Sequence, residues 1–176
     1  TLNNSGSGKV VLSGSIASNS GLLGFTGGSF DVLGGITGTG SLHKQGTGTL
    51  THSNTNTSTY TGATLVSAGT MLVNGALSGS SGVAVSSGAT LGGTGSITHG
   101  VTVVSGATLS PGASIESLGL GSLDLDGSLL IEWDTTVSPH IDLLNIASTL
   151  NLGSNSSVTF ANLGAGFLDL NTAYIF

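Results

Sequence analysis

The chain has 176 residues, 31 of them Gly, with 38% hydrophobic and 6% charged residues and a formal net charge of −6. This length allows one domain with a sizeable core, but Lys9 and Lys44 are the only Lys or Arg residues, which excludes the basic surface that nucleic acids and anionic lipids require. The absence of Cys excludes disulfides and thiolate metal sites.

The N-terminal stretch, residues 1–36, contains two short apolar runs that predict strands. They are GKVVLSG at 8–14 and SFDVLGG at 29–35, each bounded by Gly or Ser. This stretch follows the repeat found further along the chain only poorly. We therefore expect irregular coils or a cap at 1–36 and a repeat region at 37–176, the two forming one continuous domain.

Apolar and polar residues alternate in several short runs of the repeat region, and each run predicts a β-strand. The runs are bounded by Gly, Asn, Ser or Asp, and no window of the chain has helical spacing. We therefore expect an all-β protein. The predicted strands include Val83–Val85, Val101–Val103, Leu123–Leu125, Leu129–Trp133, Leu150–Leu152 and Val158–Phe160.

A short phrase recurs at an interval of 18 residues, where GATLGG at 88–93 is followed by GATLSP at 106–111. Periods of roughly 18–25 residues made of short strands and tight turns are typical of solenoids. Without helices, the natural form is a parallel β-helix in which like residues stack about 4.8 Å apart along the axis. The sequence therefore predicts a parallel β-helix of about eight coils.

The repeat also predicts which residues stack in the core and which form the corners. Alignment on Gly-x-x-Leu and on the valines before it gives a core ladder of Leu72, Leu91, Leu109, Val85 and Val103. Corners need backbone angles that Gly adopts most readily. The glycines expected at corners are Gly75, Gly88, Gly106 and Gly112.

The segment GTGSLHKQGTGTLTHSNTNTSTYTGATLVSAGTMLVNG, residues 38–75, resembles the autotransporter-associated β-strand repeat of bacterial passenger domains. The phrases GATLGGTGSI, GATLSPGASIESL, EWD and DLLNI further along are similar to the region downstream of that repeat in such passengers, whereas His52 and Ala63 depart from the repeat. The resemblance implies a right-handed β-helix, export and surface display, but no single activity. The resembling positions are Leu42, Lys44, Gly46, Gly48, Thr49, Leu50, Tyr60, Thr61, Gly62, Gly69 and Leu72.

Two carboxylate pairs are the candidate catalytic groups, Asp124 with Asp126 and Glu132 with Asp134. Their i, i+2 spacing places both members of a pair on one face of a strand, outward if the neighbouring apolar residues point inward. Such pairs can act as acid and base on a glycosidic bond or bind Ca²⁺. The other reading is a solvated strand face that keeps an apolar rod soluble. We favour it because no Lys lies nearby in the sequence to neutralise an acidic sugar.

The histidines and the single Trp favour structural roles. His43, His52, His99 and His140 are isolated and lack metal-ligand spacing, so we expect no metal and no cofactor. Trp133 has the chemistry of a sugar-stacking platform, but its alternation with Ile131 favours a core position.

Two classes of function stay open. The favoured one is a non-catalytic extracellular scaffold of a bacterial surface protein, used in adhesion or structure. A version of it self-associates head to tail into fibres, because Ile175 and Phe176 end the chain without a polar cap. The alternative is a polysaccharide-binding or polysaccharide-degrading protein that acts through the carboxylate pairs. The expected partners are other copies, other surface proteins and glycans, without nucleic acid or membrane insertion by this segment.

Overall fold

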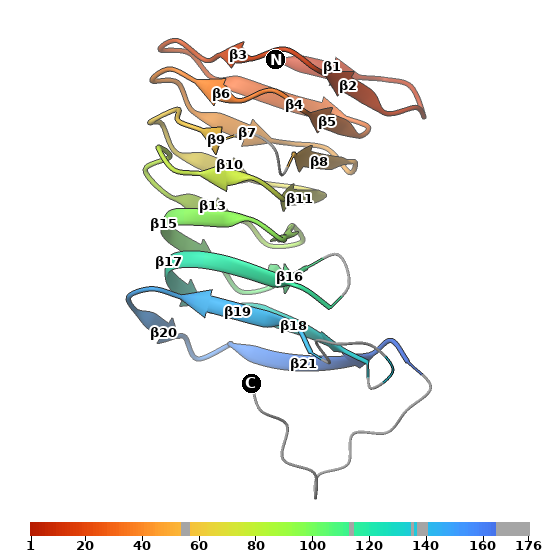
Figure 1. The fold of residues 1–176 in the computed structure, drawn as a ribbon, viewed down its shortest axis with the longest axis vertical. Helices are drawn as coiled ribbons and strands as arrows, with labels where there is room; N and C mark the ends of the chain where they lie inside the picture. Colours follow the sequence, from red (N-terminus) through yellow and green to blue (C-terminus); the bar gives the residue numbers. More distant parts are fainter. Residues whose placement is uncertain (54–56, 113–114, 135, 137–140, 165–176) are drawn as a thin grey trace, which may run out of the picture.

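In the computed structural model, the chain forms a parallel β-solenoid whose coils stack along the long axis of the molecule (Figure 1). The structure describes residues 1–53, 57–112, 115–134, 136 and 141–164. Among these residues all secondary structure is strand, and neighbouring named strands pair in parallel. The predicted all-β parallel β-helix is therefore confirmed.

The strands form three faces, and each face continues from coil to coil. The first face consists of β1 (Leu2–Asn4), β4 (Leu23–Gly27), β7 (Leu42–Lys44), β10 (Thr64–Val66), β13 (Val83–Val85), the second parts of β15 (Ser96–Val103) and β17 (Ser117–Leu125), and β20 (Leu150–Leu152). The second face consists of β2 (Val10–Leu12), β5 (Phe30–Val32), β8 (Thr49–His52), β11 (Thr70–Val73), β14 (Thr90–Gly93), β16 (Thr108–Pro111), β18 (Ser128–Trp133) and β21 (Ser157–Asn162). The third face consists of β3 (Ile16–Ala17), β6 (Ile36–Thr37), β9 (Thr57–Ser58), β12 (Ala76–Leu77), the first parts of β15 and β17, and β19 (Leu143–Ile146).

The number of turns is the first correction to the sequence analysis. The solenoid makes about six turns, slightly fewer than the eight coils predicted. The prediction assumed one interval along the whole chain, but the C-terminal coils are longer. Asn151 contacts Asp124 and Asn155 contacts Asp126, at separations of 27 and 29 residues.

The N-terminal stretch is built into the same sheets as the repeat region. Its strand β2 pairs with β5, and β5 pairs with β8, in both cases in parallel. Both of the N-terminal runs predicted as strands are strands, and so are the six runs predicted further along the chain.

The core consists of columns of apolar side chains that run from coil to coil. Leu91 pairs with Leu109, and Val85 pairs with Val103, as the repeat predicts, and all four side chains are fully buried. Leu72 was placed in this ladder wrongly. Met71 is the residue that pairs with Leu91, and it is buried, whereas Leu72 pairs with Gly92 and lies on the outer side of β11.

The reason for the error at Leu72 is the period-2 geometry of a strand. A slip of one residue in the alignment moves a side chain from the core to the surface. Because Met71 and Leu72 are both apolar, the sequence offered no polar residue that would have fixed the register.

Three of the four predicted corner glycines have backbone angles in the left-handed region. The φ angles are +79° at Gly88, +79° at Gly106 and +82° at Gly112. Gly75 was expected to share this conformation, and it is not among the glycines with positive φ. It is buried directly before β12, where the sequence alone does not distinguish a tight bend from a left-handed corner.

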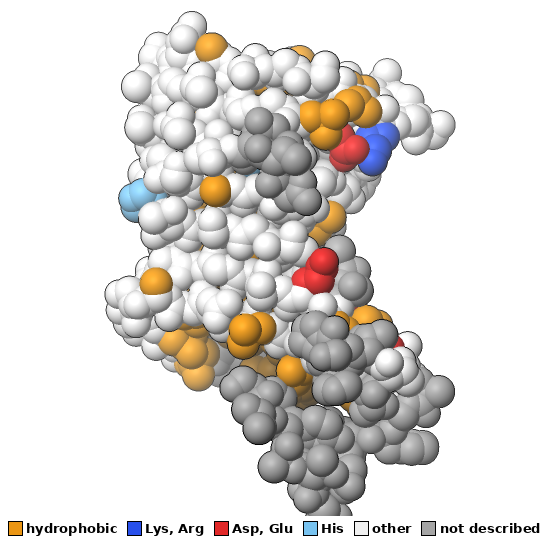
Figure 2. Space-filling view, viewed as in Figure 1, with side chains coloured by type: hydrophobic (Ala, Val, Ile, Leu, Met, Phe, Trp, Pro, Cys, Tyr) orange, Lys and Arg blue, Asp and Glu red, His pale blue; other side chains and the backbone are white. Residues whose placement is uncertain are grey.

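The surface carries few charges and few large apolar side chains over most of its length (Figure 2). The large apolar side chains that are 45–64% exposed in the last described coil form a group. They are Leu143, Leu150, Leu152, Val158, Phe160 and Leu163. Within the described residues, no helix has the length and apolarity of a membrane-spanning segment.

Candidate functional site

The predicted pair Asp124 and Asp126 faces outward from β17, because Leu123 and Leu125 point into the core. Asp124 accepts a hydrogen bond from the side-chain amide of Asn151 at 2.5 Å. Asn151 belongs to β20 on the neighbouring coil, so this carboxylate joins two coils across the outer surface.

Asp126 contacts the same neighbouring coil a few residues further on. Its carboxylate accepts hydrogen bonds from both the backbone N–H and the side-chain amide of Asn155, each at 3.0 Å. These bonds lower the pKa of Asp126 below the ordinary range of an aspartate. A lowered pKa keeps the group ionised, which is the opposite of what a general acid needs.

The second predicted pair, Glu132 and Asp134, does not form a matched pair of free carboxylates. Asp134 accepts hydrogen bonds from the backbone N–H and the hydroxyl of Thr136, at 2.7 and 2.6 Å, which closes a local turn. Glu132 is partly buried on β18. The pKa of its carboxyl is raised, first by burial and second by the charge of Asp142.

Asp142 is the carboxylate that sequence analysis missed. Its side chain is 5% exposed and accepts hydrogen bonds from the backbone N–H groups of Glu132, at 2.8 Å, and Glu116, at 3.1 Å. Burial raises the pKa of Asp142, although these two hydrogen bonds oppose the rise. Asp142 thus joins the strand segment before β17 to β18, and an aspartate at the start of the apolar DLLNI run was the only signal for it.

The two predicted pairs lie on different faces of the solenoid, because β17 contributes Asp124 to the first face and β18 contributes Glu132 to the second. Asp124 and Asp126 line an open surface hollow together with Thr102, Asn151 and Gly153. In the part of the chain that the structure describes, no three His, Asp or Glu side chains gather in a way that could hold a metal ion.

The histidines are not brought together either. His43 lies on the outer side of β7, where its Nε2 is 2.8 Å from the hydroxyl of Ser67, whereas His52 points into the core from β8. His99 is exposed on β15. The position of His140 lies outside the described residues.

Trp133 is less buried than the sequence predicts. Ile131 is 8% exposed, but Trp133, two residues later on β18, is only partly buried. Its backbone forms an isolated antiparallel bridge with Ile141, where the chain leaves the second face. The alternation therefore gives the correct side of the strand but not the depth of burial.

The interior contains a group of polar side chains that the functional prediction did not include. The ammonium of Lys44 is fully buried and donates hydrogen bonds to the carbonyl oxygens of Gln45, Gly46 and Ala68, at 3.1, 2.8 and 3.1 Å. Burial lowers the pKa of Lys44. The period-2 pattern does signal this residue, because Lys44 stands two places after the buried Leu42.

Tyr60 continues this polar interior on the next coil. Its hydroxyl is hydrogen-bonded to that of Thr64, which lies 3.2 Å from the hydroxyl of Ser80, and all three side chains are buried. Burial raises the pKa of Tyr60. Each polar group has a partner inside the protein, so the arrangement is that of a structural network.

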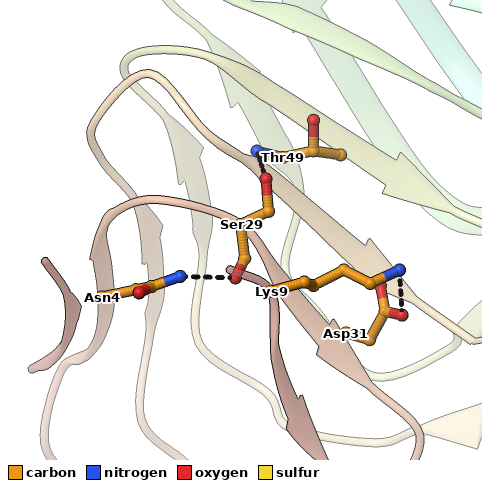
Figure 3. A network of polar contacts seen from close by, with 5 residues as sticks. All are labelled: Asn4, Lys9, Ser29, Asp31 and Thr49. Atoms are coloured by element: carbon orange, nitrogen blue, oxygen red, sulfur yellow. Dashed lines mark hydrogen bonds and ion pairs between the residues drawn. The ribbon is translucent and has the colours of Figure 1, made fainter. Parts of the chain in front are cut away.

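At the N-terminal end, another polar network links three successive coils (Figure 3). The side-chain amide of Asn4 donates to the carbonyl of Ser29 at 3.0 Å, and the hydroxyl of Ser29 accepts the backbone N–H of Thr49 at 3.0 Å. Beside it, the ammonium of Lys9 forms an ion pair with Asp31 at 2.6 Å. The polar groups here also connect coil to coil.

Most of the polar groups described above bind a neighbouring coil or fill the interior, and the open hollow beside Asp124 is the surface feature best placed to meet a ligand. Comparisons of this chain with protein-family models, with curated proteins and with solved structures found no match.

Proposed function

We propose that this chain is a non-catalytic scaffold, a structural or adhesive β-helical segment of a bacterial surface protein that is displayed outside the cell like an autotransporter passenger. The observation that carries the proposal is the use of the outward carboxylates of β17. Asp124 and Asp126, the best acid–base candidates of the sequence, are hydrogen-bonded to Asn151 and Asn155 of the neighbouring coil. Groups used in this way stabilise a rod rather than act on a substrate.

Composition supports the same proposal. A chain with 6% charged residues and 31 Gly presents a surface of backbone, hydroxyl and amide groups along stacked coils. A stack of coils places such groups at regular spacing over a long surface, which suits contact with another extended surface more than capture of one small molecule.

The alternative, a glycan-binding or glycan-degrading protein, depends on the hollow beside Asp124 and Asp126. Incubation of the purified protein with a panel of acidic polysaccharides tests it, with product release as the readout for cleavage and calorimetry as the readout for binding. We expect no turnover. Turnover by the wild type that is lost in Asp124→Asn or Glu132→Gln would replace the scaffold proposal with the enzymatic one.

Adhesion is tested separately with beads that carry the folded protein. We expect these beads to cluster or to attach to cells more than beads carrying the heat-unfolded chain, and we expect Asp124→Asn to leave this effect unchanged. Equal behaviour of folded and unfolded chains on a broad set of cells and surfaces would contradict an adhesive role and leave the structural one.

Self-association is the version of the proposal that involves a second copy. Leu152 and Phe160 continue the core columns of Leu125 and Ile131, yet they are 64% and 61% exposed. A coil of the same kind stacked on β20 and β21 would bury them and pair their strand edges. Electron microscopy and sedimentation test this. Assemblies that are lost in Leu152→Lys but kept in the exposed turn variant Ser154→Lys support it, and monomers at high concentration contradict it.

A further inference from the structure

His52 occupies a position in the core that apolar residues occupy on the neighbouring coils. On the second face, its register partners are Val32 of β5 and Val73 of β11, both fully buried. The imidazole itself is 2% exposed. A group that can take up a proton therefore lies in a column otherwise built for aliphatic side chains.

The hydrogen bonds of His52 satisfy the neutral imidazole on one side only. Its Nε2 is 2.7 Å from the hydroxyl oxygen of Ser58 on β9, and this oxygen also accepts the backbone N–H of Ile36 at 2.9 Å. The other ring nitrogen, Nδ1, is buried and has no hydrogen-bond partner among the described residues. Protonation would make both ring nitrogens donors, so a charged N–H would lie in the core without an acceptor.

No neighbouring group of the described strands is placed to neutralise that charge. On β5, Asp31 lies on the outer side of the strand and is paired with Lys9. On β7, His43 faces outward, and Lys44, itself a cation, is bound to carbonyl groups at the corner before β8. The described strands β9 and β11 contain no titratable side chain, and the hydroxyl of Tyr60, after β9, is bonded to Thr64.

We propose that the coil made by β7, β8 and β9 is an acid-responsive element, in which protonation of His52 breaks the contact with Ser58 and opens the solenoid between β8 and β9. The opening starts at Ser58, because the same hydroxyl holds the Ile36 backbone of the preceding coil. This inference does not depend on the function proposed above.

The direction of the pH effect follows from burial, which lowers the pKa of His52 from 6.5 to about 4. In the unfolded chain the imidazole takes up its proton near pH 6.5, before the folded protein does. The stability is therefore complete above that pH and decreases as the pH falls from about 6.5 to about 4. For a group with these two values, the unfolding equilibrium constant increases roughly 100-fold from pH 7 to pH 4.

Denaturant unfolding of three proteins between pH 7 and pH 4 tests the proposal. His52→Val places in the column the residue found on both sides of it, and His99→Val removes an exposed imidazole as the matched control. We expect the roughly 100-fold increase in the wild type and the control, beyond any change shared with His52→Val. Parallel pH curves for the wild type and His52→Val would overturn the proposal.

Measurements on the wild type keep the test decisive even if His52→Val does not fold. The first is an NMR titration of the His52 ring, and the second is hydrogen exchange of the Ile36 amide, whose acceptor is Ser58. We expect the ring to stay neutral down to about pH 4 and the Ile36 amide to lose protection as the ring titrates. Titration of the ring near pH 6.5 in a protein that keeps the Ile36 amide protected would overturn the proposal.

Discussion

Leu91 of β14 lies directly beside Leu109 of β16, and both side chains are fully buried. Thr90 and Thr108 pair in the same two strands, so the phrase that recurs after 18 residues places identical side chains at identical positions of neighbouring coils. The apolar side chains form the core, and the strand backbones above and below them form the hydrogen bonds. Each coil is therefore stabilised mainly by its two neighbours.

The ladder makes the first prediction, which concerns stability. Leu91→Ala leaves a cavity bounded by the neighbouring coils, and we expect it to lower the free energy of unfolding by about 2–5 kcal/mol. Leu109→Ala should cost a similar amount, and the double variant should deviate from the sum because the two cavities join. Denaturant unfolding measures this. Leu65→Ala, at a side chain that is 37% exposed on β10, is the control, and an equal loss there would contradict the ladder.

The two lysines give a second, matched prediction. Lys44→Ala leaves three buried carbonyl groups without their donor, and we expect a loss of roughly 3 kcal/mol in the free energy of unfolding. Lys9→Ala breaks an exposed ion pair with Asp31 and should cost at most about 1 kcal/mol. Thermal and denaturant unfolding of both variants checks this contrast, and a larger loss for Lys9→Ala would refute it.

The fold could be predicted from the sequence because a solenoid repeats its environment. Residues that occupy the same pocket on successive coils resemble one another, so the interval of 18 residues between Leu91 and Leu109 already contained the stacking. The register was less secure where two apolar residues are adjacent. This is why Met71 and not Leu72 pairs with Leu91.

The contacts of the candidate site could not be predicted in the same way. Asp126 is bound by Asn155, 29 residues later, and neither residue belongs to the repeated phrase. Asp142 depends on the path of the chain between β18 and β19, where the repeat gives no guidance. His52 was visible, since it stands two places after the buried Leu50, but its burial was not used to infer a chemical property.

The corner glycines provide a third prediction. Gly88 has φ +79° and no atom within 4 Å of the place where a Cβ would lie, so Gly88→Ala tests the backbone conformation alone. We expect a loss of about 1–2 kcal/mol. Gly106→Ala, at the same φ, should cost more because its Cβ would also collide with Ser87.

Gly8→Ala is the control for the corner prediction, because Gly8 has no positive φ and equally open surroundings. The comparison is made by denaturant unfolding of the three variants side by side. A loss at Gly8 as large as that at Gly88 would mean that the left-handed conformation is not the cause.

Glu132 and Asp142 give the last prediction, and its pH dependence is opposite to that of His52. The pKa of each carboxyl is raised in the folded protein, so each favours folding in the protonated form. That stabilisation is present at pH values below the ordinary range of a carboxyl and is lost as the pH rises through the folded pKa. Glu132→Gln should therefore be more stable than the wild type at pH 7, and the difference should diminish toward pH 4. Asp142→Asn should be less stable at both pH values, because an amide replaces one of the two oxygens that accept backbone N–H groups. Denaturant unfolding at the two pH values checks both variants, and an advantage of Glu132→Gln that is largest at pH 4 would show that the two carboxylates do not repel each other in the folded protein.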